Sequence, residues 1–246
     1  MKLHIGVALL ATSVLLVACD DDDDGTTGTN GQTAQVRVVN ASSATGGTDV
    51  FVGSNSSAAA SNVAAGAMGA SCFTVPAGSQ TLNFRATGGG TTNLASTTAF
   101  NFQSGQQYTV VLTGSGTGAG SRSASVLSDN GVTSASAGNN GLRFFNTTGA
   151  ATDVYVTAPS GTLGTASVSN VANNSASTGG TLGGGFSSFA TGNTQVRTFA
   201  AGGATTGTPT VNFTLPTLTG NRMGTVVLTG GTGTQAFVSM PCNTTT

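Results

Sequence analysis

The chain of 246 residues carries very few charges, with 7 Lys or Arg, 8 Asp or Glu and a formal net charge of −1. Its only lysine and histidine, Lys2 and His4, stand at the extreme N-terminus, and glutamate does not occur. This composition excludes Ser-His-Asp, Cys-His and Ser-Lys catalytic sites and histidine-ligated zinc from the body of the protein. The arginines are scattered, which argues against nucleic-acid binding. We therefore expect no enzymatic activity, no cofactor and no metal site.

The first segment, residues 1–18, has the organisation of a bacterial export signal. Lys2 gives a positive start, and the apolar stretch over residues 5–17 is shorter than the roughly 20 residues of a membrane-spanning helix. It ends in Leu-Val-Ala-Cys, which resembles the lipobox of bacterial lipoproteins. The resemblance implies that Cys19 is lipidated and becomes the mature N-terminus, with the membrane as partner through that lipid. The alternative is an ordinary signal peptide that happens to precede a cysteine.

Residues 19–33 continue with five aspartates, Asp20 to Asp24, followed by small polar residues. Like charges repel one another and the small polar residues bury little apolar area, so we expect a disordered, acidic tether. The aspartate run could instead be a sorting signal or a loose Ca²⁺ site, although a flexible polyaspartate lacks the preset geometry of a calcium loop. Together with the signal, the tether predicts a location in the bacterial cell envelope. The outer membrane, at either its periplasmic or its surface face, is favoured over the inner membrane.

After the tether, short apolar runs appear and then recur in the same order roughly 105–115 residues later. In the first runs every second residue is strongly apolar, as at Val36 and Val38 or Val50 and Val52, which is typical of strands with one buried face. No stretch has helical periodicity. The matched segments are VRVVN (36–40) with LRFFN (142–146), TDVFV (48–52) with TDVYV (152–156), and YTVVLTG (108–114) with GTVVLTG (224–230).

These repeated runs predict a tandem duplication in an all-β protein. About seven short strands in each copy of about 100 residues are typical of an antiparallel β-sandwich of immunoglobulin-like size. The predicted organisation is a first sandwich over residues 34–130, a linker over 131–141 and a second sandwich over 142–246.

The order of VRVVNAS, TDVFV, VPAG, YTVVLTG and SVLSDN resembles the bacterial domain of unknown function 4397. The resemblance is good from about Gln35 to Asn130. It is weaker in the second copy, where FATG (189–192) replaces VPAG (75–78). The family brings no established catalytic residues, so the resemblance implies an exported β-sandwich protein and no particular activity.

Two Arg–Asp combinations recur at matching places in the two copies. If the first two strands of each copy form a hairpin, Arg37 and Asp49 lie on one face, and Arg143 and Asp153 do likewise. We therefore predict cross-strand ion pairs, each worth under about 1 kcal/mol if partly exposed. The alternative is that these residues contact a ligand.

Two cysteines, Cys72 and Cys242, remain once Cys19 is set aside. An even number of cysteines in an oxidising compartment predicts a disulfide, which here would join the first copy to the end of the second. The alternatives are two buried free thiols or intermolecular bonds.

These observations favour a non-enzymatic envelope lipoprotein, acting as a binding, adhesion or envelope-structural module with a protein or glycan ligand. The alternative is a self-associating structural protein, because low charge and strands rich in Val, Thr and Phe leave sheet edges poorly protected against pairing. A hydrolase that works through aspartates alone is the weakest reading. The sequence leaves the ligand, the oligomeric state and the relative orientation of the two copies open.

Overall fold

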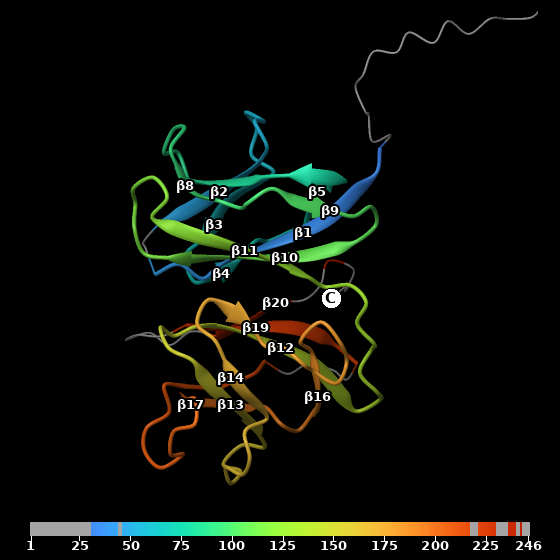
Figure 1. Ribbon diagram of the computed structural model, residues 1–246, viewed down its shortest axis with the longest axis vertical. Coiled ribbons are helices and arrows are strands. Elements are labelled where there is room, and N and C mark those ends of the chain that lie inside the picture. Colours follow the sequence, from blue (N-terminus) through green and yellow to red (C-terminus); the bar gives the residue numbers. More distant parts are fainter. Residues whose placement is uncertain (1–30, 44–45, 217–220, 230–235, 240–241, 243–246) are drawn as a thin grey trace, which may run out of the picture.

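The computed structural model describes residues 31–43, 46–216, 221–229, 236–239 and 242 (Figure 1). The predicted signal, the lipidation site Cys19 and most of the acidic tether lie outside these residues. Thr33, at the end of the predicted tether, already begins the first strand. All regular elements in the described part are β-strands, so the predicted all-β class is confirmed. None of the described residues form a helix long and apolar enough to cross a membrane.

The first half of the chain, called repeat one here (residues 33–130), is a two-layer sandwich. Its inner sheet has the strand order β11-β10-β1-β4, with β5 also paired to β1, and its outer sheet has the order β3-β2-β7-β8. A separate pair, β6 and β9, closes one side. The strands are β1 (Thr33–Asn40), β2 (Gly47–Val52), β3 (Ala60–Ala64), β4 (Ala67–Met68), β5 (Phe73–Pro76), β6 (Gly78–Gln80), β7 (Leu82–Ala86), β8 (Asn93–Ser96), β9 (Phe100–Phe102), β10 (Gln107–Gly114) and β11 (Arg122–Ser128).

The second half, repeat two (residues 139–242), has the same strand order in its inner and outer sheets, without a described counterpart of the β6–β9 pair. Its inner sheet runs β15-β12-β19-β20 with β16 also paired to β12, and its outer sheet runs β14-β13-β17-β18. Its first strand begins at Asn139, inside the predicted linker over 131–141. The strands are β12 (Asn139–Thr147), β13 (Thr152–Thr157), β14 (Val168–Val171), β15 (Ser175–Ala176), β16 (Ser187–Ala190), β17 (Gln195–Ala200), β18 (Val211–Thr214), β19 (Met223–Thr229) and β20 (Ala236–Ser239).

Each sandwich holds its own hydrophobic core between the inner and outer sheets. The alternating residues of the predicted runs supply it: Val36 and Val38 of β1 and Val50 of β2 are at most 1% exposed. Leu142 and Phe144 of β12 occupy the corresponding places in the core of repeat two. The period-two pattern therefore identified the core-facing side of these strands correctly.

The prediction that the first two strands of each repeat form a hairpin is wrong. Strand β1 pairs in parallel with β10, placing Val38 opposite Val110, whereas β2 belongs to the other sheet and pairs with β3 and β7. Strands β12 and β19 form the same parallel pair in repeat two. The remaining strand pairings are antiparallel. Strands β10 and β19 each contain an unbroken Val-Val-Leu run, as is typical of central strands that are buried on both faces.

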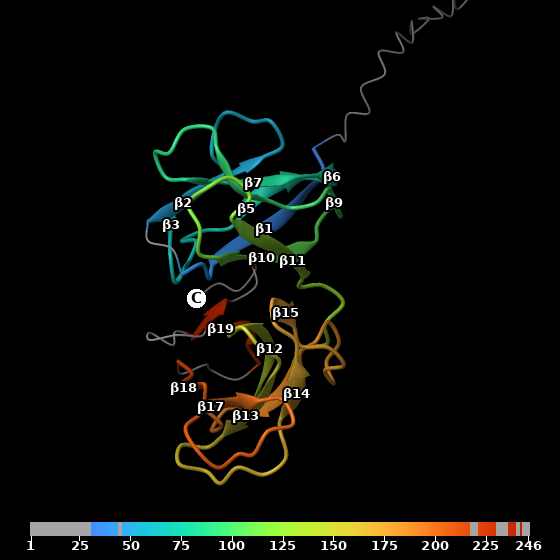
Figure 2. The ribbon, with the colours of Figure 1, turned by 60° about the vertical axis from the view of Figure 1, so that its left-hand side comes forward.

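The second buried face comes from the packing of the two inner sheets against each other. Figures 1 and 2 show the repeats stacked along the long axis, so that the four sheets form successive layers. The contact between the inner sheets, called the junction here, contains a third apolar cluster. Its buried members are Val39, Ala41 and Val111 from repeat one and Phe145 and Val227 from repeat two, with Met68, Leu127 and Ala176 packed around them.

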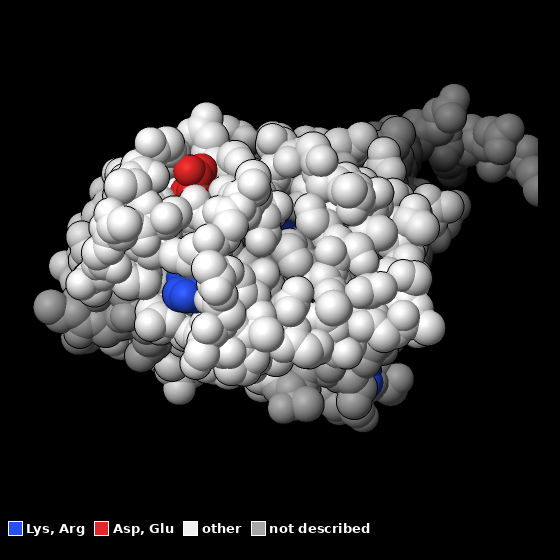
Figure 3. All heavy atoms as spheres, turned by 90° about the horizontal axis from the view of Figure 1, so that it is seen from below, with Lys and Arg blue, Asp and Glu red and all other residues white. Residues whose placement is uncertain are grey.

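Few charges remain for the surface. Arg122, Arg143 and Asp153 are each under 9% exposed. The face of repeat two that points away from repeat one is almost entirely uncharged (Figure 3). Within the described part of the chain, several of the few ionic groups therefore lie inside the fold.

The junction makes a testable contribution to stability through Phe145, which is completely buried there. We expect Phe145→Ala to lower the free energy of unfolding by about 3–5 kcal/mol, because it removes a ring from a packed cluster. Urea unfolding of the full chain measures this loss. The matched control is Thr74→Ala on β5, whose side chain is exposed. A loss under about 1 kcal/mol for Phe145→Ala would show that the junction is not tightly packed.

Candidate functional site

The junction brings equivalent positions of the two repeats together. The matched runs align Val39 with Phe145 and Val111 with Val227, and all four side chains lie in the junction cluster. The same face of each repeat therefore packs against its counterpart, as the two subunits do in an isologous dimer. Two polar clusters adjoin this apolar contact. One is built around Arg37 of the VRVVN run and the other around Arg143 of the LRFFN run.

One polar cluster is a buried ion pair between the repeats. Nη2 of Arg143 on β12 lies 2.5 Å from Oδ1 of Asp129, which follows β11, and the two side chains are 2% and 1% exposed. Thr109 donates to the other carboxylate oxygen at 2.8 Å, and Arg143 also donates to Thr225. The guanidinium stacks on the ring of Phe186 at 4.5 Å. Arginine, carboxylate and ring together close this side of the junction.

Burial dominates the electrostatics of this pair. It raises the pKa of the Asp129 carboxyl, and the guanidinium of Arg143 and the hydroxyl of Thr109 oppose that rise. It also lowers the pKa of Arg143, against the attraction of Asp129. Each partner therefore depends on the other to remain charged in this poorly solvated position.

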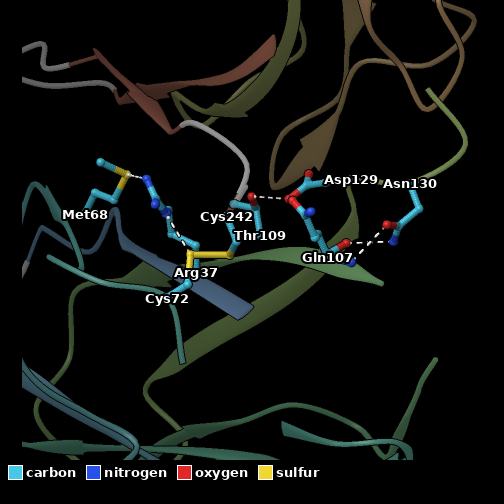
Figure 4. Close-up of a disulfide and its surroundings, with 8 residues drawn as sticks. All are labelled: Arg37, Met68, Cys72, Gln107, Thr109, Asp129, Asn130 and Cys242. Carbon is cyan, nitrogen blue, oxygen red and sulfur yellow. Dashed lines mark hydrogen bonds between the residues drawn. A yellow bond between two sulfur atoms is a disulfide. The ribbon is translucent and has the colours of Figure 1, made fainter. Parts of the chain in front are cut away.

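The second polar cluster is a disulfide between the repeats (Figure 4). Cys72, just before β5, is bonded to Cys242, with Cα atoms 5.8 Å apart and 170 residues between them in the sequence. Nε of Arg37 donates to Sγ of Cys72 at 3.3 Å, and Nη1 donates to Sδ of Met68 at 3.3 Å. The predicted pairing of these two cysteines is therefore the one present in the structure.

The two clusters occupy corresponding places in the two repeats. Strand pairing aligns Phe73 with Ser187, because these residues lie opposite Val36 and Leu142, and so Cys72 corresponds to Phe186. Each arginine thus contacts the residue at that position. Counting onward from β11 and β20 aligns Asn130 with Cys242. Asn130 exchanges hydrogen bonds with the Gln107 backbone of its own repeat, whereas Cys242 reaches across to the other repeat.

The predicted ion pairs Arg37–Asp49 and Arg143–Asp153 are wrong. The assumed hairpins do not exist, and each aspartate lies in an outer sheet while each arginine lies in an inner sheet. Among the described residues the one ion pair within 4 Å is Arg143–Asp129. The sequence pattern assigned no role to Asp129. The available signal was that it is the one aspartate of the body without a counterpart in the other repeat.

Asp49 and Asp153 instead share a role in holding the outer sheets together. Asp49 accepts hydrogen bonds from the backbone N–H of Asn62 and the hydroxyl of Thr87, each at 2.8 Å. Asp153 accepts from the backbone N–H of Asn170 at 2.7 Å. Asn62 and Asn170 have φ values of 51° and 52°, so the carboxylate steadies the same left-handed turn in both repeats. In both repeats the aspartate therefore acts as a hydrogen-bond acceptor within the outer sheet.

A groove of about 460 Å³ opens between the ends of the inner sheets. Small residues contributed by both repeats line it, and the described lining contains no charged side chain. Under one wall, Arg122 is 6% exposed and donates to Ser42 and Thr48 hydroxyls and to the Gly116 carbonyl. The lining residues are Ala41, Ser42, Ser43, Ala65, Gly66, Thr113, Gly114, Ser115, Ser123, Thr147, Asn174 and Thr229.

The groove can offer hydroxyl groups and backbone polar groups to a ligand, but it holds no arrangement suited to acid–base chemistry. The described residues also contain no group of three His, Cys, Asp or Glu side chains that could hold a metal ion. The chemistry available at the groove is therefore hydrogen bonding.

The ion pair at the junction is tested by a double-mutant cycle. We expect Asp129→Asn to lower the free energy of unfolding by about 3–5 kcal/mol, because it leaves the Arg143 guanidinium buried without a counter-charge. Adding Arg143→Met should recover much of that loss, since the unpaired charge is removed. Chemical denaturation of the wild type, both single variants and the double variant measures the coupling. Strictly additive losses would contradict a direct interaction.

Comparison with known proteins yields a family. A search among curated proteins finds no match. The sequence model described as "Domain of unknown function (DUF4397)" matches residues 34–157. This match spans nearly all of repeat one and continues through β12 and β13 of repeat two, which is just over half of the chain. As its repeated motifs predicted, the chain belongs to the DUF4397 family.

Proposed function

We propose that this protein is a lipid-anchored, non-enzymatic component of the bacterial cell envelope whose two repeats form one rigid binding body. The Cys72–Cys242 disulfide carries this proposal. Disulfides persist in oxidising compartments outside the cytoplasm, which is where the lipobox at Cys19 would send the chain. The sequence signal and the bond thus point independently to export.

Rigidity follows from the three different contacts that join the repeats. The junction cluster packs the inner sheets together, and the Arg143–Asp129 pair and the Cys72–Cys242 disulfide each add a further connection between the repeats. A bond that closes a 170-residue loop contributes about 5 kcal/mol in the chain-entropy account. A body held in this way can present a surface of fixed shape at the end of an acidic tether.

The groove between the repeats is the proposed binding surface. Its uncharged lining of Ser, Thr, Asn and Gly suits a polar, uncharged ligand such as a glycan or an extended peptide backbone. Its size is within the range of about 300–1,000 Å³ typical of ligand sites. Because both repeats contribute its walls, it depends on the repeats staying fixed relative to each other.

Anchoring is tested by following the protein in intact cells. We expect the wild-type chain in the membrane fraction and the Cys19→Ala variant in the soluble, exported fraction, because the variant cannot accept the lipid. Immunoblotting of fractionated cells measures both, and added protease distinguishes a surface body from a periplasmic one. A Cys19→Ala variant that stays membrane-bound would contradict the lipid anchor, while a cytoplasmic wild type would contradict export.

The second candidate function is a self-associating structural protein, and the nearly uncharged face of repeat two favours it (Figure 3). Exposed edges such as β11 carry Ser, Ala and Val but no lysine or proline, the residues that commonly protect edges from pairing.

Sedimentation velocity over a hundredfold range of protein concentration distinguishes the two functions. We expect a constant sedimentation coefficient for a monomeric binding body, because the junction already buries the most apolar face inside one chain. A coefficient that rises steadily with concentration would favour the self-associating protein instead.

A further inference from the structure

The surroundings of the Cys72–Cys242 disulfide distinguish it from a disulfide that is purely structural and unreactive. The guanidinium of Arg37 lies against one of the two sulfurs, with Nε 3.3 Å from Sγ of Cys72 (Figure 4). The thioether of Met68 holds the same guanidinium from the other side through Nη1. Both cysteine residues are partly exposed.

We propose that this bond opens and closes by thiol–disulfide exchange, and we call it the clasp. In the exchange, Arg37 makes Cys72 the leaving sulfur, and Cys242 accepts a low-molecular-weight thiol. An adjacent guanidinium stabilises a thiolate, and a sulfur that leaves as a more stable thiolate leaves faster. Arginine stays cationic under all physiological conditions, so the bias does not depend on the protonation of Arg37.

The exchange step is a simple displacement. The thiolate of the small thiol attacks Sγ of Cys242, and a new S–S bond forms there. The Cys72–Cys242 bond breaks, and its electron pair stays on Sγ of Cys72 as a thiolate beside Arg37. A second small thiolate can then attack the sulfur of the bound small thiol, which releases Cys242 as a thiolate and forms a small-molecule disulfide. Alternatively, the Cys72 thiolate attacks Sγ of Cys242, expels the small thiol as a thiolate and restores the protein disulfide.

Opening the clasp would leave the rest of the junction in place. The Arg143–Asp129 pair and the apolar cluster do not involve either cysteine, so the repeats stay associated. The Cys242 position would lose its tie to repeat one and carry the added group. Asp129 lies near enough to Arg37 to interact with its charge. Its carboxylate is bound to Arg143 and Thr109, however, so it does not take the Arg37 guanidinium away from Cys72.

The comparison with repeat two supports a specific role for the sulfur. Arg143 contacts the ring of Phe186 at the place where Arg37 contacts Cys72, so an arginine at this position is part of the repeat. Only in repeat one does the arginine meet a sulfur that can leave as an anion. The inference shares the disulfide with the proposed envelope function, but it concerns the exchange chemistry of the bond and not the anchor or the groove.

The test uses the full exported chain, extracted in mild detergent and treated with N-ethylmaleimide to block any free thiol. The disulfide-bonded protein is exposed briefly to glutathione at fixed pH, quenched with acid and alkylated with iodoacetamide. Peptide mass spectrometry then gives the ratio of glutathione on Cys242 to glutathione on Cys72. Early times are used, before the adducts exchange further.

We expect the wild type to carry glutathione on Cys242 in about three- to tenfold excess over Cys72. Arg37→Gln should bring the ratio near one and slow the reaction, whereas Arg37→Lys should retain part of the bias. Arg85→Gln is the matched control, because Arg85 lies in the outer sheet over Phe51, away from the disulfide.

Three outcomes would overturn the proposal. They are a wild-type adduct found mainly on Cys72, an unchanged ratio in Arg37→Gln, and a wild-type protein in which both cysteines are already blocked by N-ethylmaleimide. If Arg37→Gln fails to fold, the wild-type ratio and the Arg37→Lys variant still decide the matter. Failure of the lipid anchor would leave these results unaffected, and a failed exchange bias would leave the anchor unaffected, whereas free thiols at both cysteines would count against both proposals.

Discussion

The structure depends on the burial of β1, β10, β12 and β19 on both faces. Each of these strands sends alternate side chains into the core of its own sandwich and the intervening ones into the junction, as Val38 and Val39 do. A strand of this kind must lie in the middle of a sheet and must be covered on both sides. Neither inner sheet can therefore be exposed to water without uncovering apolar side chains. In this protein the equivalent sheet of the other repeat covers them.

This constraint explains why the two repeats behave as one body. A duplicated sandwich with an apolar outer surface can bury that surface by packing against its own copy, in the manner of a symmetric dimer. Linking the copies in one chain replaces association between molecules with contact inside a molecule. Sequence divergence can then act on the two sides of the junction separately. Arg143 of repeat two forms a buried ion pair with Asp129, whereas its counterpart Arg37 in repeat one lies against the disulfide of Cys72 and Cys242.

The small number of charged side chains limits the kinds of partner that the protein can recognise. Arg37, Arg122 and Arg143 act as internal donors to sulfur, hydroxyl, carbonyl or carboxylate groups, and Asp49 and Asp153 hold turns. Few ionic groups remain to recognise a charged partner. The exposed features that remain are the hydroxyl-lined groove between the repeats and the weakly charged faces, both of which suit neutral polar ligands or contact with other weakly charged surfaces.

The amino-acid sequence by itself determined the all-β class, the core-facing residues of the main strands, the duplication of the motifs and the family, and it favoured a bond between Cys72 and Cys242 without excluding free thiols. These follow from local alternation, composition and counting, which do not require knowledge of which strand lies beside which. Tertiary structure decided the partners of the charged side chains. Arg143 meets Asp129 and not Asp153, because β12 and β13 belong to different sheets and the parallel pairing of β12 with β19 aligns the two repeats face to face. Such partners are set by strand order and by packing between layers, and a period-two pattern carries no information about either.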